Sequence, residues 1–265
     1  MESLLKSFNE GELLQSIAQT QSQLKKQPKN EGLRFLLAQF YLLNHQYEKA
    51  LVHFNVLEKA AARNMERAFS IHCYQKITAA LDSRSRFFHE KKMIEIDVAT
   101  LSESALETLL KRLTNQQPRH SEEADRVAMP LTLTRSDGTQ LSGEALDPDD
   151  LLHGYIECIS QQGCYRLCAI EDLESMTFEA PLKPLDCLLQ RVNIKWKQKD
   201  NIAPESETLL HINHYPFNHE EVTDLNITDW DANKIPDLVV GIGQKVICVN
   251  DDVVPVSQIR HLTFR

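Results

Sequence analysis

The chain has 265 residues, of which 42% are hydrophobic and 25% charged, and this ordinary globular usage excludes a disordered or fibrous protein. Its formal net charge of -9 would repel a phosphate backbone, and its lysines and arginines are scattered, so we expect no nucleic-acid partner. The length suits one large domain or two ordinary ones.

The N-terminal segment and the apolar runs bear on the compartment. Met1–Leu14 carries Glu2, Glu10 and Glu12 and lacks the basic start and apolar stretch of a secretory signal. No segment approaches the roughly 18 apolar residues that span a bilayer. The six cysteines are typical of reduced thiols rather than of a disulfide framework. We therefore expect a cytoplasmic protein without a membrane partner.

The first half of the chain has the helical period. Apolar residues recur three and four positions apart from Leu4 to Leu113, and Glu31–Arg63 reads as two helices joined by the polar connection Asn44–Gln46. When Glu31 takes the first position of a roughly 34-residue tetratricopeptide repeat (TPR), the small Ala38 and Ala50 fall where paired helices approach closely.

The preceding stretch fits the same register. Pro28 falls on the usual terminal proline of a repeat, and Leu13–Lys26 falls on a second helix. We therefore predict a TPR-like helical domain over residues 1–120. The alternative is a generic pair of antiparallel helices, because a repeat stack normally needs three or more units.

A polar, charged segment between Pro118 and Met129 marks the expected domain boundary. Beyond it, Leu131–Arg135 alternates with period two and leads into the turn signal Ser136–Thr139, which predicts a strand entering a hairpin. The sequence after the boundary therefore predicts strands rather than helices.

Asp147–Asp150 is typical of a helix start and predicts a helix over Leu151–Ser160 that ends near Gly163. Short alternating runs between Tyr165 and Phe264 predict further strands. We predict an α+β domain over residues 126–265 with a mainly antiparallel sheet, and hence an α+β class for the whole chain.

Three groups of residues carry a resemblance to a known family. They are Leu33–Phe40 with Gln46–Leu51, then Asp147–Asp150 with Gly163–Leu167 and Pro181–Asp186, and finally Gly241–Val246 with Val254–Val256. Their order resembles the ImpE family, also called TagJ, an accessory component of bacterial type VI secretion systems. The chain departs from the family between about Ala80 and Pro118, where the usual tryptophan-bearing helical stretch is missing.

The resemblance implies a non-enzymatic adaptor that docks onto the small subunit of the contractile sheath, through a helix near that subunit's N-terminus. A TPR-like hairpin presents a concave face that can accept such a helix, and its inner positions here are Phe35, Gln39, Leu42 and Leu43. The same four residues could instead contact the preceding helices. A TPR-like adaptor for an unrelated partner shares this physics and differs only in the ligand.

A different class of function is a hydrolase or metal-dependent enzyme built on the α+β half. His211, His214 and His219–Glu220 form the densest titratable group, but the pattern is not HExxH and surrounds Pro216 in a loop. A solvated loop is the simpler interpretation. The acids Asp147, Asp149, Asp150 and Glu157 could form a paired-carboxylate site, but helix capping already accounts for the first three.

Two further patterns fall short of a cofactor site. Cys158, Cys164 and Cys168 lack the CxxC spacing of zinc sites and are interpreted as core cysteines in a helix followed by a strand. Gly241–Gly243 lacks the third glycine of a nucleotide loop and predicts a bulge or a close backbone approach. We expect no metal and no cofactor.

Overall fold

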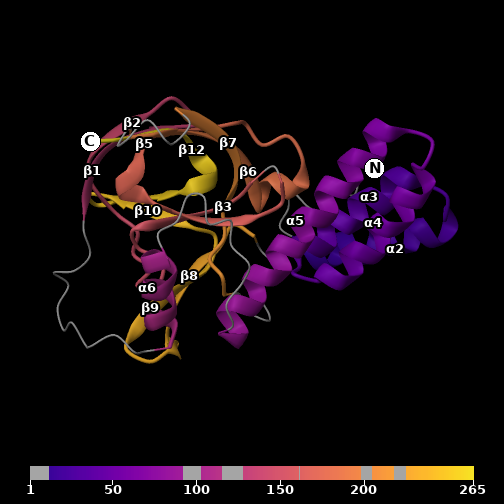
Figure 1. The fold of residues 1–265 in the computed structure, drawn as a ribbon, viewed down its shortest axis with the longest axis horizontal. Coiled ribbons are helices and arrows are strands. Elements are labelled where there is room, and N and C mark those ends of the chain that lie inside the picture. The colour runs from indigo at the N-terminus through magenta and orange to yellow at the C-terminus, as the bar shows by residue number, and fades with distance from the viewer. Residues whose placement is uncertain (1–11, 92–102, 115–127, 161, 198–204, 218–224) are drawn as a thin grey trace.

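The computed structural model describes residues 12–91, 103–114, 128–160, 162–197, 205–217 and 225–265. The helices between residues 13 and 90 gather on one side of the molecule and the strands on the other, and the long helix α5 (Met65–Glu90) reaches toward the sheet (Figure 1). The helix over residues 103–113 lies on the strand side, beside the sheet. The predicted α+β class is confirmed. The expected boundary between Pro118 and Met129 lies almost wholly outside the described residues, so the two domain limits stay a prediction.

The other described helices are α2 (Leu13–Lys26), α3 (Glu31–Leu43), α4 (Tyr47–Ala60) and α6 (Glu103–Leu113). The sequence predicted α2, and it predicted α3 and α4 with their tight connection. The side chain of Asn30 caps α3 by accepting a hydrogen bond from the amide of Leu33 at 3.0 Å. After α3, His45 adopts the left-handed conformation, with φ 54°, that turns the chain into α4.

Small residues set the spacing between α3 and α4. Ala38 and Ala50 are both fully buried, as the TPR register predicted. Phe54 of α4 is buried beside them, and its ring stacks on Tyr74 of α5 with the centroids 5.5 Å apart. The helices α3, α4 and α5 therefore pack in succession, each against the next.

Ten strands form one sheet in the order β11-β10-β2-β1-β12-β5-β6-β7-β3-β4, and all neighbouring pairs are antiparallel. These strands are β1 (Met129–Arg135), β2 (Gln140–Leu146), β3 (Tyr155–Ile159), β4 (Tyr165–Ala169), β5 (Leu173–Phe178), β6 (Leu189–Trp196), β7 (Ser206–Ile212), β10 (Val246–Val249), β11 (Asp252–Pro255) and β12 (Ile259–Phe264). A separate hairpin pairs β8 (Thr228–Ile235) with β9 (Leu238–Gly243). Val254 of β11 and Cys168 of β4 share one buried cluster from opposite ends of the order, so the sheet curls around its core (Figure 1).

The helix predicted over Leu151–Ser160 is wrong, because a turn and then β3 occupy this stretch. One carboxylate oxygen of Asp149 caps the turn by accepting from the amide of Leu152 at 2.5 Å. The other oxygen accepts from the amide of Gly241 in β9 at 2.6 Å. This partner ties the acidic turn to the β8–β9 hairpin, and the apolar run that follows enters the sheet. Short apolar runs suit a buried strand as well as a helix.

The close backbone approach predicted at Gly241–Gly243 is confirmed. A Cβ atom at Gly241 would lie 2.5 Å from the ring of Tyr215, and Gly243 adopts a positive φ of 78°. Glycine at position 241 therefore lets the hairpin lie directly against the ring, whereas glycine at position 243 permits the left-handed backbone beside the carbonyl of Ile227.

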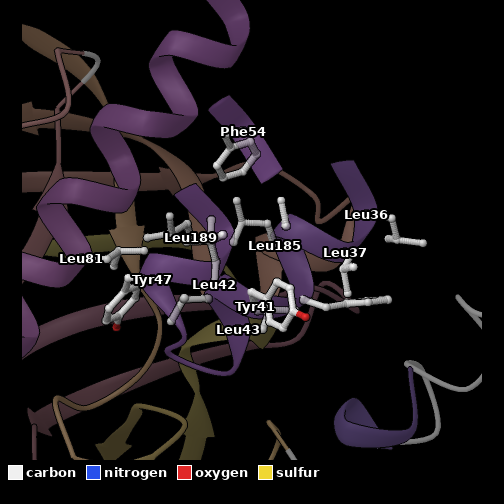
Figure 2. Close-up of a cluster of buried hydrophobic side chains, with 14 of the residues drawn as sticks. Leu36, Leu37, Tyr41, Leu42, Leu43, Tyr47, Phe54, Leu81, Leu185 and Leu189 are labelled. Carbon is white, nitrogen blue, oxygen red and sulfur yellow. The ribbon is translucent and has the colours of Figure 1, made fainter. Parts of the chain in front are cut away.

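The helices and the sheet share a hydrophobic core. Leu185, Leu188 and Leu189, at the start of β6 and in the short 3-10 helix η4 (Pro184–Cys187) before it, are buried in the same cluster as the leucines of α3. Figure 2 shows Leu185 and Leu189 beside Leu42 of α3. Repeat stacks normally need three units for stability. Here the start of β6 covers the open face of the helical stack in place of a further repeat.

A buried ion network also joins the two halves through Glu157 of β3, which is fully buried. Arg84 of α5 donates to both carboxylate oxygens, at 2.6 Å from Nε and 2.7 Å from Nη2. Lys245 Nζ and the hydroxyl of Tyr165 each donate at 2.7 Å. Burial alone would raise the pKa of Glu157, but the charges of Arg84 and Lys245 and their hydrogen bonds hold it well below its usual range.

The shared core predicts that Leu185→Ala destabilises the whole chain by about 2–5 kcal/mol, because it empties a buried leucine site between the two halves. Chemical denaturation followed by circular dichroism measures the free energy of unfolding. Leu182→Ala is the matched control on the same segment, because Leu182 is 90% exposed whereas Leu185 is 3% exposed. The control should stay within about 0.5 kcal/mol of the parent. Equal effects of the two changes would contradict the shared core.

The ion network predicts that Glu157→Gln lowers the free energy of unfolding by about 3–5 kcal/mol, because Arg84 and Lys245 remain buried without their counter-charge. Asp82→Asn is the control, since it breaks the exposed pair with Arg86, whose atoms lie 2.6 Å apart, and should cost at most about 1 kcal/mol. A loss below 1 kcal/mol for Glu157→Gln would show that the network does not hold the halves together.

Candidate partner-binding surface

The structure separates the four residues predicted to face a partner. Gln39, Leu42 and Leu43 are buried within the chain, and the two leucines belong to the core that the start of β6 covers. Phe35 is only partly buried and sits at the edge of this core. The described residues therefore form no open face that presents all four side chains, and the partner-binding role of the set stays a prediction.

Phe35 lines an open hollow between α3 and α5 with a volume of about 480 Å³. We call it the α3–α5 hollow; its walls include Glu31, Phe35, Glu66, Arg67, Ser70 and Tyr74. The rings of Phe35 and Tyr74 meet edge to face with centroids 4.9 Å apart and form its apolar wall. In the predicted TPR register, α3 and α5 would each be the first helix of a repeat, and the space between such helices belongs to the inner face of a TPR stack.

A second hollow of about 480 Å³ lies between α5 and the segment that leads from β5 into β6. We call it the α5–β6 hollow; its walls include Phe69, Ser70, Tyr74, Leu182, Lys183 and Arg191. Phe69 is 69% exposed and Leu182 is 90% exposed. Large apolar side chains left open around a surface hollow are typical of a protein-binding site.

The charges around the two hollows are nearly balanced, since four acids and three bases line them. Arg67 forms an ion pair with Glu31, and Arg191 lies 3.8 Å from Glu179. The third base, Lys183, lies 4.0 Å from Asp186 and donates to the Tyr74 hydroxyl at 3.0 Å. A partner therefore meets an apolar surface with little net charge.

The predicted histidine group is buried rather than solvated. His211 lies in β7 and His214 follows that strand, and both side chains are almost completely covered. Burial lowers the pKa of each to about 3, with nearby positive charge adding to the shift. His219 and Glu220 lie outside the described residues. Within the part of the chain that the structure describes, no group of three His, Cys, Asp or Glu side chains could hold a metal ion.

The acids of the predicted carboxylate site make hydrogen bonds and ion pairs within the chain. Burial raises the pKa of Asp149 to about 7, and the neighbouring Asp147 adds to the shift. Both oxygens of Asp149 nevertheless accept backbone amides, and Glu157 is committed to Arg84 and Lys245. Asp147 and Lys245 line a cavity of about 60 Å³ in the curled sheet, most of whose other walls are apolar. A cavity of this size holds a few water molecules.

The cysteines are all free thiols, and Cys158 lies in β3 rather than in the predicted helix. Cys168 is buried in β4, where the sequence predicted a strand. None of the helices among the described residues is long and apolar enough to cross a membrane.

These features define an α+β protein whose TPR-like helices are covered by a curled antiparallel sheet and leave two apolar hollows open. Residues 138–263 match the ImpE protein family, and this confirms the resemblance read from the sequence. Over these residues the chain is similar to ImpE-family proteins, and this similarity associates it with type VI secretion.

A solved structure is similar to this protein over nearly the whole chain. It is the crystal structure of protein VPA1032 from Vibrio parahaemolyticus, with a TM-score of 0.77 and 19% sequence identity over 99% of this chain and 97% of that one. At this identity the likeness shows the shared fold alone. No curated protein matches the chain.

The buried histidines predict a pH dependence of stability. Because His211 and His214 stay neutral in the folded chain down to about pH 3 but gain a proton near 6.5 when unfolded, the unfolded state binds more protons between these values. Each histidine should therefore lower the free energy of unfolding as the pH drops from 6.5 toward 3, by up to about 1.4 kcal/mol per pH unit. The raised pKa of Asp149 acts in the opposite sense and offsets part of this loss above the ordinary pKa of an aspartate.

The double variant His211→Gln and His214→Gln should flatten this slope when urea denaturation is measured at several pH values. The exposed His72 supplies the control, since His72→Gln removes a histidine that is not buried and should leave the slope unchanged. An unchanged slope in the double variant would show that other groups cause the pH dependence.

Proposed function

We propose that this protein is a cytoplasmic, non-enzymatic accessory protein of a bacterial type VI secretion system that binds the small subunit of the contractile sheath. The match to the ImpE family supports the association with type VI secretion. The observation that carries the binding role is the α3–α5 hollow on the inner face of the TPR-like helices. We expect the subunit to bind there through a helix near its N-terminus.

The physical basis is the recognition of an amphipathic helix in an apolar groove. Such a helix buries apolar side chains against the groove and keeps its polar face in water. Phe35 and Tyr74 supply the apolar wall, and the open position at Ser70 leaves room for an incoming side chain. Of the four positions derived from the TPR register, Phe35 is the one that this hollow uses.

A TPR-like adaptor for an unrelated partner would use the same hollow and differ only in its ligand. The identity of the partner therefore rests on the family, and the place of binding rests on the geometry. One binding experiment with the sheath subunit tests both.

The whole chain should capture the purified sheath small subunit, and the isolated N-terminal helix of that subunit, at micromolar concentration. Ser70→Trp should weaken this capture at least about tenfold, or about 1.4 kcal/mol, because an indole at this exposed position fills the hollow. Isothermal titration calorimetry measures the dissociation constant.

His72→Trp is the matched control, because it adds the same indole to an exposed position of α5 that lines neither hollow. It should bind like the parent chain. Absence of capture by the parent chain at micromolar concentration would refute the sheath subunit as partner, and equal binding by both tryptophan variants would refute the α3–α5 hollow as the place of contact.

A further inference from the structure

The two hollows are parts of one groove that crosses α5. Both include Ser70 and Tyr74, which lie one helical turn apart on the exposed side of α5. The α3–α5 hollow lies on one side of this line of residues, and the α5–β6 hollow lies on the other. A partner segment that crosses α5 at Ser70 therefore reaches both hollows at once.

The α5–β6 hollow belongs to both halves of the chain. Phe69 projects from α5, whereas Leu182 and Lys183 come from the segment between β5 and β6. Leu185, only three residues after the exposed Leu182, is buried in the shared core and anchors this segment against the helices. The wall that carries Leu182 is therefore held in place next to α5.

The secondary structure around the groove indicates which conformation a bound segment adopts. β6 is paired on both sides, with β5 and with β7, so it offers no free strand edge to an extended peptide. The other walls named here are helices and the segment that contains η4. An occupant therefore gains no strand pairing from the sheet, and an α-helix, which satisfies its own backbone hydrogen bonds, suits the groove best.

The charges around the groove decide the chemistry of the occupant. Each lining base is paired with a lining acid, and Glu66 is the additional acid at the α3 side. The groove therefore suits an apolar helical face that carries a basic residue at the end lying over Glu66.

We propose that the groove binds one amphipathic partner helix with two apolar anchors, one in each hollow, and a basic residue facing Glu66, so that the sheet half takes part in recognition. This inference rests on the proposed function and adds to it the second hollow and the character of the helix. Phe69 and Leu182 enclose the anchor in the α5–β6 hollow, and Phe35 and Tyr74 enclose the other.

The test is a fluorescence-anisotropy titration of the labelled N-terminal helix of the sheath small subunit with the full chain and its variants. Leu182→Glu and Phe69→Glu should each weaken binding at least tenfold, because each places a charge beside the buried anchor. Glu66→Lys should weaken binding and make added salt less inhibitory, because it removes the attraction for a basic residue.

Val253→Glu is the matched control, since Val253 is an exposed apolar residue of β11 that lines neither hollow. It should bind like the parent, and thermal denaturation should show that every variant remains folded. Binding of Leu182→Glu within twofold of the parent, while Ser70→Trp binds weakly, would overturn this inference and leave the proposed function standing. No binding by the parent chain would overturn both.

Discussion

The arrangement of the two halves depends on the charges gathered around the carboxylate of Glu157. Two cations and a tyrosine hydroxyl converge on a side chain with no access to water. Buried ion pairs often add little net stability, because desolvation offsets their attraction. Their geometry is demanding, however, since any displacement of Arg84 leaves a charge unpaired in the interior. The network therefore fixes where α5 lies relative to β3, and α5 carries one wall of each hollow.

The shared apolar core covers hydrophobic surface that the helices alone would leave exposed to water. A short TPR-like stack leaves part of its apolar surface uncovered, and here that part includes Leu42 and Leu43 of α3. The segment from η4 into β6 covers it with leucines, and Ile212 of β7 adds to the same cluster. The hydrophobic contact supplies most of the attraction between the halves, and the ion network supplies the orientation.

The helices could be predicted from the sequence because their signals are local. The period of apolar residues, the cap at Asn30 and the tight turn at His45 all lie within a few positions of the elements they define. The cover over Leu42 and Leu43 could not be predicted, because Leu185 and Leu189 of the same buried cluster lie far along the chain. Phe35 remained accessible because it lies at the rim of that contact.

The difference between local and long-range contacts also explains why the helix predicted over Leu151–Ser160 was wrong. Asp149 has the local signature of a helix cap, but its second bond reaches Gly241, 92 residues away, and this contact decided between a turn and a helix. The acid Glu157 stood out in the sequence, yet its partners Arg84 and Lys245 are 73 and 88 residues distant. The residue types therefore indicated which side chains were candidates for a functional site. Only the fold shows whether these side chains bind a ligand or each other.

Because the α5–β6 hollow is lined by both halves of the chain, a fragment that contains only the helices cannot reproduce the proposed binding site. A fragment that ends before β1 would lose the leucines of η4 and β6 and would expose Leu42 and Leu43 to water. These leucines would then form an apolar face that the whole chain does not present, and many amphipathic helices could bind to it. The fragment would also lack Leu182, which borders the α5–β6 hollow. Binding by the fragment would therefore report on a different surface, and single substitutions in the whole chain are the sound way to locate the partner.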